Sequence, residues 1–537
     1  MWPDSSESGH TPAMAASVIL AARSESRDPQ LVLIFILRRL AAAVGILLAS
    51  SVLMYVLAIN SGDPLADLQE SNADNRELLI QQRIDYMNLD MPWYQRYLTW
   101  LLGVGKCFVG ACDLGKNRSG QDVWPLLQQA AGSTLQLVFL ATLLALVLGI
   151  AIGVLTAVRQ YSGLDYGVTF VTFLFFSLPV FWAAVLFKEY LAIGYNDWLR
   201  DPQFTPVEIA LIAIVAGLLM QIFLGGSLRR RLITFAVTAA FFAIAIPTLL
   251  ALDFFRQPQL GPVGVAVLTI AAALTIVVLS VGLQNRKVLS PVLITAGLVI
   301  VMQFALVNVF VYYMNWWIII GGLALAVAVP WAIAHYMGGR YRTVAIGASV
   351  ATGVIGAGLT VLDHIFRTWP SFLDKKPRPI STIGSHTPNF TGDFWQVFLD
   401  HATQLLLPTL ILTAISLASY SRYTRSSMLE VNRQDFIRTA RAKGAPERVV
   451  IFRHALRNAL IPIATIAAFD FAGLIGGAVV TERVFGWTGM GALFSNGLSL
   501  VDPAPVMAFF LVTGLAAIIF NMLADITYAS LDPRIRA

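Results

Sequence analysis

Charged residues and cysteines are scarce in this 537-residue chain. Only 13% of its residues are charged and two are cysteine, whereas 57% are hydrophobic and the mean hydropathy is +0.71. This composition excludes an ordinary soluble domain, in which about 25% of residues are charged. The net charge of +6 does not indicate a nucleic-acid-binding surface, because the basic residues gather at the ends of apolar runs. The chain is therefore predicted to be a polytopic membrane protein.

Motifs for catalysis and nucleotide binding are also missing from the sequence. It has no Gly-x4-Gly-Lys-Ser/Thr phosphate loop, so the chain is not expected to bind ATP itself. Its six histidines are scattered, and none forms a helical pair with an acidic residue at metal-ligand spacing. We expect neither an enzyme nor a metal or cofactor site in this chain.

Long apolar runs dominate instead. A helix needs roughly 20 apolar residues to cross the hydrocarbon core, and it satisfies its own backbone groups there. The sequence therefore predicts an all-α membrane protein with about twelve spans. These spans are 37–59, 134–158, 167–192, 207–225, 232–252, 262–283, 289–312, 316–336, 343–362, 402–421, 459–480 and 506–526.

Lysine and arginine predict the orientation of these spans. Arg38 and Arg39 lie at the start of the first span, and Arg534 and Arg536 follow the last. Basic residues favour the cytoplasmic side, so both termini are predicted to be cytoplasmic. The same assignment places three basic turns, at 229–231, 286–287 and 340–342, on the cytoplasmic side. Their recurrence about every 55 residues suggests a repeated helical hairpin.

The most informative segment is basic, covers 435–457 and lies between two spans. Residues 435–442 are predicted to form a helix that Gly444 ends in a left-handed cap, and Pro446 suits the start of a second helix. Two helices joined by a sharp turn would form a rigid knob that fits a cleft on another protein. An ordinary basic cytoplasmic loop would explain the charge, but not the register around Gly444.

This segment resembles the coupling loop of bacterial ABC importer permeases, in the degenerate form of the dipeptide and oligopeptide permeases. The register places 438–440, Gly444 and 454–457 at the motif positions. Other motifs that match this family, in chain order, are 36–40, 61–64, 89–97, 113–115, 177–182, 407–410, 422–431, 481–491 and 531–536. Their order and spacing together are far more specific than any one of them.

The resemblance implies a permease fold with six core transmembrane helices, within about 35–200 and 368–537. It implies import of dipeptides or oligopeptides across a bacterial cytoplasmic membrane, with an extracytoplasmic binding protein delivering the substrate. A second homologous permease and two ATPase subunits that bind ATP and Mg²⁺ are the implied protein partners. The residues implied in ATPase coupling are Asp435, Arg438, Thr439, Ala440, Arg441, Lys443, Gly444, His454, Leu456 and Arg457.

Two other transport functions remain as alternatives. Related permeases share these motifs across cargoes, so the same machinery importing nickel or another small solute is the first. The second is a secondary transporter, which would be expected to place coupling carboxylates at related positions of two halves. Asp470 has no evident mate of this kind in the sequence.

About six further helices interrupt the resemblance and are predicted to be an insertion. An even number of added spans leaves the orientation of the downstream helices unchanged. The insertion could recruit another protein, and such an accessory or regulatory role is compatible with transport. The predicted organisation is a disordered cytoplasmic tail at 1–30 with Met14 as an alternative start, a first transmembrane helix at 31–60, an extracytoplasmic loop or cap at 61–133, core helices at 134–200, the insertion at 201–365, a second extracytoplasmic loop at 366–401, and core helices at 402–537 with the coupling loop at 432–458.

Three polar side chains carry open alternatives. Asp470 lies in the middle of the eleventh span, where an ionisable group usually faces a cavity or a partner. It either lines a translocation path and meets a positive substrate group, or is a protonated or hydrogen-bonded carboxyl between helices. Cys107 and Cys112 lie in the outward segment 61–133 and form either a disulfide or two free thiols. That segment is either a folded cap or an interfacial helix.

Overall fold

The computed structural model describes residues 29–72 and 74–531, so the predicted tail at 1–30 lies almost wholly outside the described residues. Within these ranges the chain is helical, apart from irregular connections and one isolated bridge between Lys116 and Asp122. Among the described residues, eleven helices are long and apolar enough to cross a membrane, or twelve if one bent pair counts as a span. The predicted all-α polytopic fold is confirmed.

The helices divide between two compact units, residues 1–185 with 408–537 and residues 186–407. The first unit contains α2 (Pro29–Ile59), α3 (Ala66–Gln69), α4 (Arg76–Met87), α5 (Trp93–Cys107), α6 (Val123–Val158), α7 (Gly163–Ser177), α8 (Val180–Leu186), the end of α17 (Phe394–Val431), α18 (Asp435–Ala442), α19 (Glu447–Val449), η3 (Val450–Ala455), α20 (Leu456–Gly477), α21 (Val479–Phe485), α22 (Met490–Ser499) and α23 (Pro503–Leu531). The second contains η1 (Phe187–Gly194), α9 (Tyr195–Trp198), α10 (Pro206–Leu224), α11 (Leu228–Ala251), α12 (Gly261–Ser280), α13 (Arg286–Ala305), α14 (Val307–Tyr312), α15 (Trp316–Met337), η2 (Gly339–Tyr341), α16 (Arg342–Lys375) and the start of α17.

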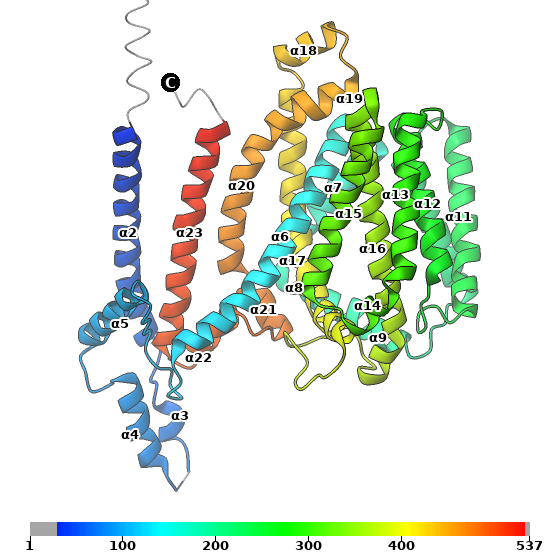
Figure 1. Cartoon of the computed structure of the whole chain (residues 1–537). Helices are drawn as coiled ribbons and strands as arrows, with labels where there is room; N and C mark the ends of the chain where they lie inside the picture. The colour runs from blue at the N-terminus through cyan, green and yellow to red at the C-terminus, as the bar shows by residue number, and fades with distance from the viewer. Residues whose placement is uncertain (1–28, 73, 532–537) are drawn as a thin grey trace, which may run out of the picture. The chain divides into compact units, whose positions relative to one another are not determined.

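In the first unit, the long helices separate two ends of different character. Figure 1 shows α18 at one end, together with the start of α2 and the end of α23. The helices α3 and α4 lie at the opposite end. The knob predicted from the sequence and the segment predicted to be a cap therefore lie at opposite ends of the membrane helices of this unit.

Glycine lets α6 and α17 approach each other closely in the first unit. A Cβ added at Gly149 would lie 2.6 Å from Cβ of Tyr420, and one at Gly153 would lie 2.4 Å from Cβ of Thr424. The two glycines are four residues apart and therefore share one face of α6. Small residues at this spacing are a common basis of helix packing in membranes, where contact depends on close van der Waals fit.

A buried ion pair joins α17 to the start of α7. Arg425 donates two hydrogen bonds to Asp165, with Nε 2.8 Å from Oδ1 and Nη2 2.9 Å from Oδ2. Asp165 is 2% exposed and also accepts a hydrogen bond from the backbone amide of Tyr161. One turn before Arg425, the Arg422 guanidinium lies 4.2 Å from the centre of the Phe176 ring, a cation–π contact between the same two helices.

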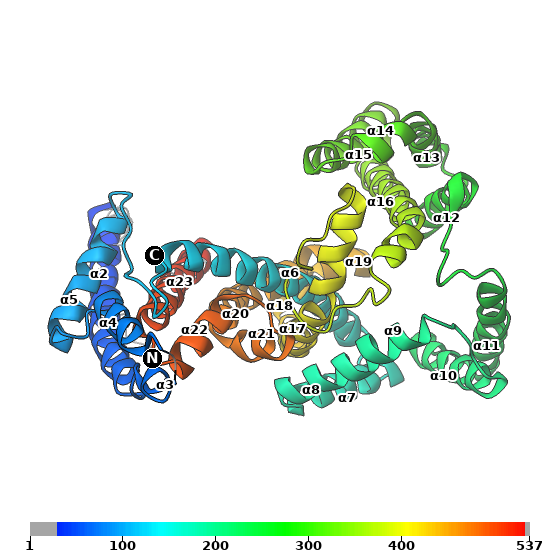
Figure 2. The same ribbon diagram turned by 90° about the horizontal axis from the view of Figure 1, so that it is seen from below.

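The second unit packs around α16, which contacts α12, α13 and α15. Gly353 and Gly356 provide room for this packing, because a Cβ at Gly353 would lie 2.4 Å from the Ala326 carbonyl oxygen and one at Gly356 would lie 2.7 Å from the Val299 side chain. The pairs α10–α11, α12–α13 and α15–α16 are each joined at one of the three predicted basic turns. The predicted helical hairpins are thus present, and Figure 2 shows α10 and α11 side by side.

Several predicted spans differ from the helices in their bounds or continuity. The third span, 167–192, is not one straight helix, because Gly163–Ser177 and Val180–Trp198 meet at an angle of 105°. Leu178 is extended there, as expected for a residue that precedes a proline. The helix of the second span begins at Val123, eleven residues earlier than predicted. The seventh is interrupted at Leu306, where α13 ends and α14 begins.

Asp165→Asn tests the ion pair between α7 and α17. We expect it to lower the free energy of unfolding by about 2 kcal/mol, because it removes the charge that a partly buried arginine pairs with. Unfolding of the purified protein by sodium dodecyl sulfate in mixed micelles measures this. The matched control is Asp197→Asn, whose ion pair with Arg378 is exposed and is expected to contribute little. Equal effects of the two changes would contradict the prediction.

Candidate functional site

The basic segment that the sequence singles out folds as a helix, a sharp turn and a second helix. The first helix, α18, covers Asp435–Ala442, the range that the sequence predicts. Gly444 follows with a φ of +75°, the left-handed conformation that glycine adopts without strain. Pro446 precedes α19, and the chain continues as a helix through η3 into α20. The second arm of the turn is therefore the beginning of a membrane helix.

The inner face of α18 is anchored by Ile437. Its side chain is fully buried in an apolar cluster with residues from the ends of α6 and α17 and from η3 and α20. The other buried members are Val154, Ala157, Met428, Val450, Ala455 and Ala459. Sequence analysis did not identify Ile437 as an anchor, although Ile437 and the partly buried Ala440 have the i, i+3 spacing of a helix face.

The outer face of α18 is exposed and mostly polar, apart from the exposed ring of Phe436. Asp435, Arg438, Thr439, Arg441, Lys443 and Gly444 are all exposed. Arg441 reaches across the turn and pairs with Glu447, with distances of 2.7 Å and 3.2 Å to its two carboxylate oxygens. Because both side chains are exposed, this ion pair sets the geometry of the turn more than it stabilises the fold. We call the exposed residues 435, 438, 439, 441, 443 and 444 the basic ridge.

The remaining predicted coupling residues lie at the base of the knob. Leu456 packs against the Ile437 cluster, and His454 is half-buried in η3. Arg457 is exposed at the start of α20. The ten predicted residues thus divide into the exposed basic ridge, two apolar contacts at Ala440 and Leu456, and a basic pair at the start of the membrane helix. A hollow of about 570 Å³, lined by residues of 426–435 at the end of α17 and the start of α18, adjoins the ridge.

Asp470 has a specific partner in the first unit. Its Oδ2 accepts a hydrogen bond from the Tyr420 hydroxyl, 2.7 Å away. Tyr420 is fully buried on α17, whereas Asp470 on α20 is half-buried. The hydrogen bond fits the interpretation as a bonded carboxyl between helices, and the exposed part of the side chain keeps the pathway interpretation open. Sequence analysis did not find Tyr420 as the partner.

At the opposite end of this unit, a buried carboxyl organises the turn between α21 and α22. Glu482 accepts hydrogen bonds from the Thr134 hydroxyl at 2.6 Å and from the Ala492 amide at 3.1 Å. Burial raises the pKa of Glu482, an effect that these bonds and one from the Gly491 amide oppose. A Cβ at Gly489 would lie 2.4 Å from Oε1 of Glu482. Residues 481–491, one of the motifs that match the permease family, fold around this carboxyl. The close approach of the backbone explains the glycines in this motif.

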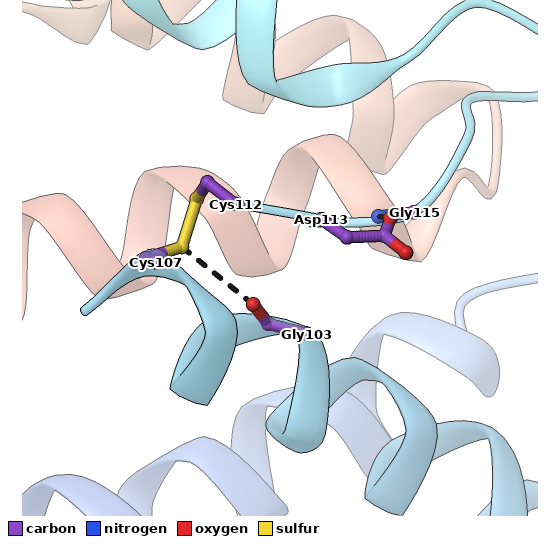
Figure 3. Close-up of a disulfide and its surroundings, with 5 residues drawn as sticks. All are labelled: Gly103, Cys107, Cys112, Asp113 and Gly115. Atoms are coloured by element: carbon purple, nitrogen blue, oxygen red, sulfur yellow. Dashed lines mark hydrogen bonds between the residues drawn. A yellow bond between two sulfur atoms is a disulfide. The ribbon is translucent and has the colours of Figure 1, made fainter. Parts of the chain in front are cut away.

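The segment between α2 and α6 is folded, and we call residues 61–122 the cap. Tyr97 and Trp100 of α5 pack against Tyr55 of α2, and Cys107 and Cys112 form a disulfide (Figure 3). Phe108, beside this disulfide, is 88% exposed, so the segment also presents the apolar surface expected of an interfacial helix.

Ion pairs tie the cap together. Asp67 pairs with both Arg83 and Arg118. Burial alone would raise the pKa of Asp67, but its hydrogen bonds with these arginines and their charges hold it below the ordinary value. The Arg118 amide in turn donates to Asp502, 2.7 Å away, at the start of α23. The cap is thereby fixed to the membrane helices of its own unit.

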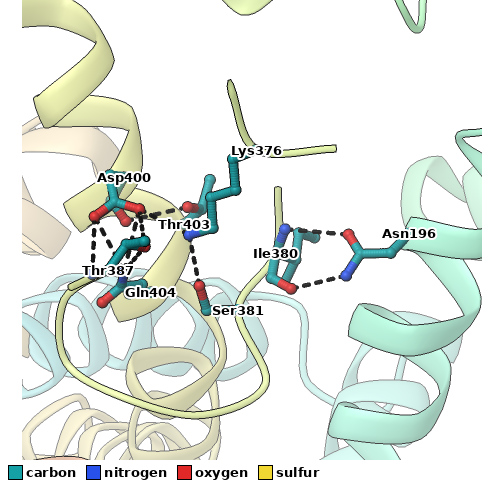
Figure 4. Close-up of polar contacts among 8 residues, drawn as sticks. All are labelled: Asn196, Lys376, Ile380, Ser381, Thr387, Asp400, Thr403 and Gln404. Carbon is teal, nitrogen blue, oxygen red and sulfur yellow. Dashed lines mark hydrogen bonds and ion pairs between the residues drawn. The ribbon is translucent and has the colours of Figure 1, made fainter. Parts of the chain in front are cut away.

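A polar network in the second unit fixes the connection between α16 and α17 (Figure 4). Asp400 accepts hydrogen bonds from Lys376 at 2.8 Å and from the Thr387 hydroxyl at 2.6 Å. Asn196 pairs with both backbone groups of Ile380, at 2.8 Å and 3.1 Å. The connection is also shorter than the loop predicted at 366–401. The helix α16 extends to Lys375, and α17 begins at Phe394.

The chain is similar in sequence to known membrane transport proteins. The family described as binding-protein-dependent transport system inner membrane component matches residues 344–537. An oligopeptide transport system permease protein of Mycobacterium tuberculosis is 44% identical over 153 residues, which are 28% of this chain and 47% of the relative. An oligopeptide transport system permease protein of Bacillus subtilis is 45% identical over 136 residues, 25% of this chain and 43% of the relative.

A third relative is covered more fully. A protein of Brucella suis named "Putative peptide permease protein" is 34% identical over 227 residues, 38% of this chain and 70% of the relative. The chain therefore spans about half the length of the first two relatives and more than two thirds of the third. It is a multi-pass membrane protein, and it belongs to the family of binding-protein-dependent transport system inner membrane components.

Gly489→Ala tests the packing around Glu482. The added methyl would overlap Oε1 of Glu482 and Oγ1 of Thr134, so we expect the free energy of unfolding to fall by about 2 kcal/mol. Gly473→Ala in α20 is the control, because a Cβ there meets nothing within 4 Å and alanine favours helix. Thermal unfolding of the detergent-solubilised protein measures both changes, and a loss of stability in the control alone would contradict the prediction.

Proposed function

We propose that this chain is the permease subunit of an ATP-driven ABC importer that takes up dipeptides and oligopeptides. The observation that carries the proposal is the knob: α18 is attached to the membrane helices by a buried apolar face and presents the basic ridge outward. The relatives are named as peptide or oligopeptide permeases, which favours peptides over nickel as the cargo. ATP hydrolysis belongs to separate subunits in this proposal.

The proposed orientation places the knob in the cytoplasm of a bacterium and the cap outside its cytoplasmic membrane. Arg159 at the end of α6 and the Arg422 and Arg425 pair of α17 lie toward the knob end of the helices. Such an accumulation of arginine favours the cytoplasmic side. Both termini would then be cytoplasmic, and the cap would face the binding protein that delivers substrate.

The contacts of the knob suggest how force passes into the membrane. Two ATPase subunits that bind ATP and Mg²⁺ would receive this knob and the corresponding knob of a second homologous permease. Because Ile437 packs against the ends of α6 and α17 and against α20, a displaced α18 moves three helices together instead of bending a loop. Asp470 lies on α20 and Tyr420 on α17, so this movement would carry the hydrogen-bonded pair with it.

Asp470 is the residue that we propose to meet the substrate. A peptide carries an ammonium group at its amino terminus, and a half-buried carboxylate in a membrane helix can bind it. The hydrogen bond from Tyr420 holds this carboxyl on one side and leaves its second oxygen for the substrate. A secondary transporter is disfavoured, since the proposed coupling runs through the knob and a separate ATPase.

Uptake of a radiolabelled dipeptide into proteoliposomes tests the proposed function. The vesicles contain this chain, the second permease, both ATPases and internal ATP, and the binding protein is added outside. We expect ATP-dependent uptake that Gly444→Asp lowers about tenfold or more, because a charge without a partner would enter the interface with the ATPase. Gly444→Asn is the matched control, since asparagine tolerates the left-handed conformation and adds no charge.

Three outcomes separate the parts of this proposal. ATP-dependent uptake that survives Gly444→Asn and is lost in Gly444→Asp supports coupling through the knob. Hydrolysis that the binding protein stimulates, without peptide uptake, would contradict peptide as the cargo while leaving the importer intact. Failure of the ATPases to bind the wild-type permeases would contradict the importer itself.

A further inference from the structure

A pocket of about 400 Å³ lies within the second unit, where the connection between α16 and α17 meets η1 and α9. Its lining comes from η1, from α9 and from residues 376–388 of the connection. This volume falls in the range of roughly 300–1,000 Å³ that small-molecule sites occupy in proteins. We call this space the loop pocket.

Hydrogen bonds hold the walls of the loop pocket in place (Figure 4). Asn196 of α9 bonds to both backbone groups of Ile380, at 2.8 Å and 3.1 Å. Further along the connection, the Thr387 hydroxyl donates to Asp400 at 2.6 Å. The chain is thus anchored on both sides of residues 381–386. A pocket that is fixed before binding loses less conformational entropy when a ligand enters it.

Several polar groups of the lining are hydrogen-bond donors that are still available. Nζ of Lys376 donates to Asp400 at 2.8 Å and to Oγ of Ser381 at 2.7 Å, which uses two of its three N–H groups. Because Ser381 accepts from this lysine, its own O–H is left to donate. Thr382 is half-buried, and its hydroxyl has no hydrogen-bond partner in the described part of the chain. These donors require an acceptor such as a carboxylate or phosphate oxygen.

The charged side chains that line the loop pocket are basic. Besides Lys376, they are Arg378 and His386, both of which are exposed and within reach of a ligand. The acidic partners Asp400 and Asp197 are not part of the lining. The contact between Arg378 and Asp197 is a single exposed one, 3.3 Å from Nη2 to Oδ1, so it is weak and leaves other guanidinium N–H groups available. The pocket therefore favours an anion.

Part of the lining is apolar. Ile193, Ile383 and Pro388 contribute to the walls, and Ile383 is 67% exposed. Covering such a side chain removes apolar surface from water, which is favourable. A ligand with an anionic group and a short apolar body would therefore use both parts of the lining.

We propose that the loop pocket binds a small organic anion, with its carboxylate or phosphate at Arg378, Lys376 and Thr382 and its apolar part against Ile383. The carboxylate of a soluble molecule and the phosphate of a phospholipid headgroup share this chemistry. The pocket contains no residue of the knob and lies in the other unit from Asp470, so the inference does not depend on the proposed transport function. It would give the second unit a ligand site of its own.

Isothermal titration calorimetry on the full chain, in dodecyl maltoside micelles and a phosphate-free buffer, tests the site. The probes are N-acetylalanine, which has a carboxylate and no ammonium group, and glycerol 3-phosphate, which represents a headgroup phosphate. The uncharged comparison is N-acetylalanine methylamide. We expect one or both anions to bind saturably and the uncharged compound to bind at least about tenfold more weakly, because it forms no charge-assisted pair with arginine.

Two arginines that pair with the same carboxylate provide a matched comparison. Arg378 and Arg200 both contact Asp197 and both are exposed, but Arg200 does not line the pocket. Arg378→Gln is expected to weaken anion binding about tenfold, because it removes the charge that faces the ligand. Arg200→Gln, which removes the same charge outside the pocket, is expected to bind within about twofold of wild type.

Thr382→Val tests the pocket through a second residue. It keeps the shape of the side chain and removes the O–H, so anion binding is expected to weaken about fivefold. Because this hydroxyl makes no hydrogen bond within the described part of the chain, thermal unfolding of the variant is expected to match wild type. Weakened binding at unchanged unfolding temperature then reports on the site and not on folding.

The results separate the source of the ligand from the existence of the site. Binding of N-acetylalanine that Arg378→Gln and Thr382→Val weaken supports a soluble carboxylate, and glycerol 3-phosphate binding with the same dependence supports a headgroup phosphate. Binding of both supports the shared anion chemistry. The proposal is overturned if neither anion binds, if the uncharged compound binds equally well, or if Arg378→Gln and Arg200→Gln bind alike.

Discussion

Burial of Ile437 against the ends of α6, α17 and α20 is the contact on which the candidate site depends. An eight-residue helix such as α18 is not stable alone in water, because nucleating a helix costs more than so few residues recover. Packing of its apolar face supplies the missing stability and also fixes the direction in which the basic ridge points. The glycine turn and the Arg441–Glu447 pair then shape the connection to α20. A docking surface made this way can transmit displacement, because its inner face is part of the membrane helix packing.

Buried polar contacts elsewhere in the first unit fix the helices that this knob would move. Arg425 and Asp165 join α17 to α7, Tyr420 and Asp470 join α17 to α20, and Thr134 and Glu482 join α6 to α21. Each brings a donor and an acceptor together where water is scarce. Loss of either partner would leave a buried polar group without a hydrogen bond and lower the stability of the fold. Glycines at the close approaches allow this geometry. The unit is thus tied at both ends and in the middle, which suits a scaffold that tilts as a body.

Much of this fold is accessible from the sequence, because membrane insertion imposes simple requirements. Roughly 20 apolar residues per span and intact backbone hydrogen bonding predict helices wherever the runs occur, and the described part of the chain has eleven or twelve. The ends of the helices were less predictable. The helix α6 begins eleven residues before the predicted span, because a helix can extend beyond the hydrocarbon. The third span bends by 105° at Pro179. Hydropathy does not record either feature. The proline was visible, but many membrane helices tolerate proline without such a bend.

The sequence by itself determined the class of protein, the helical knob at Asp435–Ala442 and the turn at Gly444, because these depend on composition, local propensity and backbone conformation. Only the tertiary structure decided which side chains meet. Ile437 as the anchor, Tyr420 as the partner of Asp470 and Glu482 beneath its glycines all join residues from different helices. Asp502 and Arg118 are 384 positions apart in the chain, and no local pattern encodes that contact. Such pairings arise from helix packing, which one sequence read along its length does not specify.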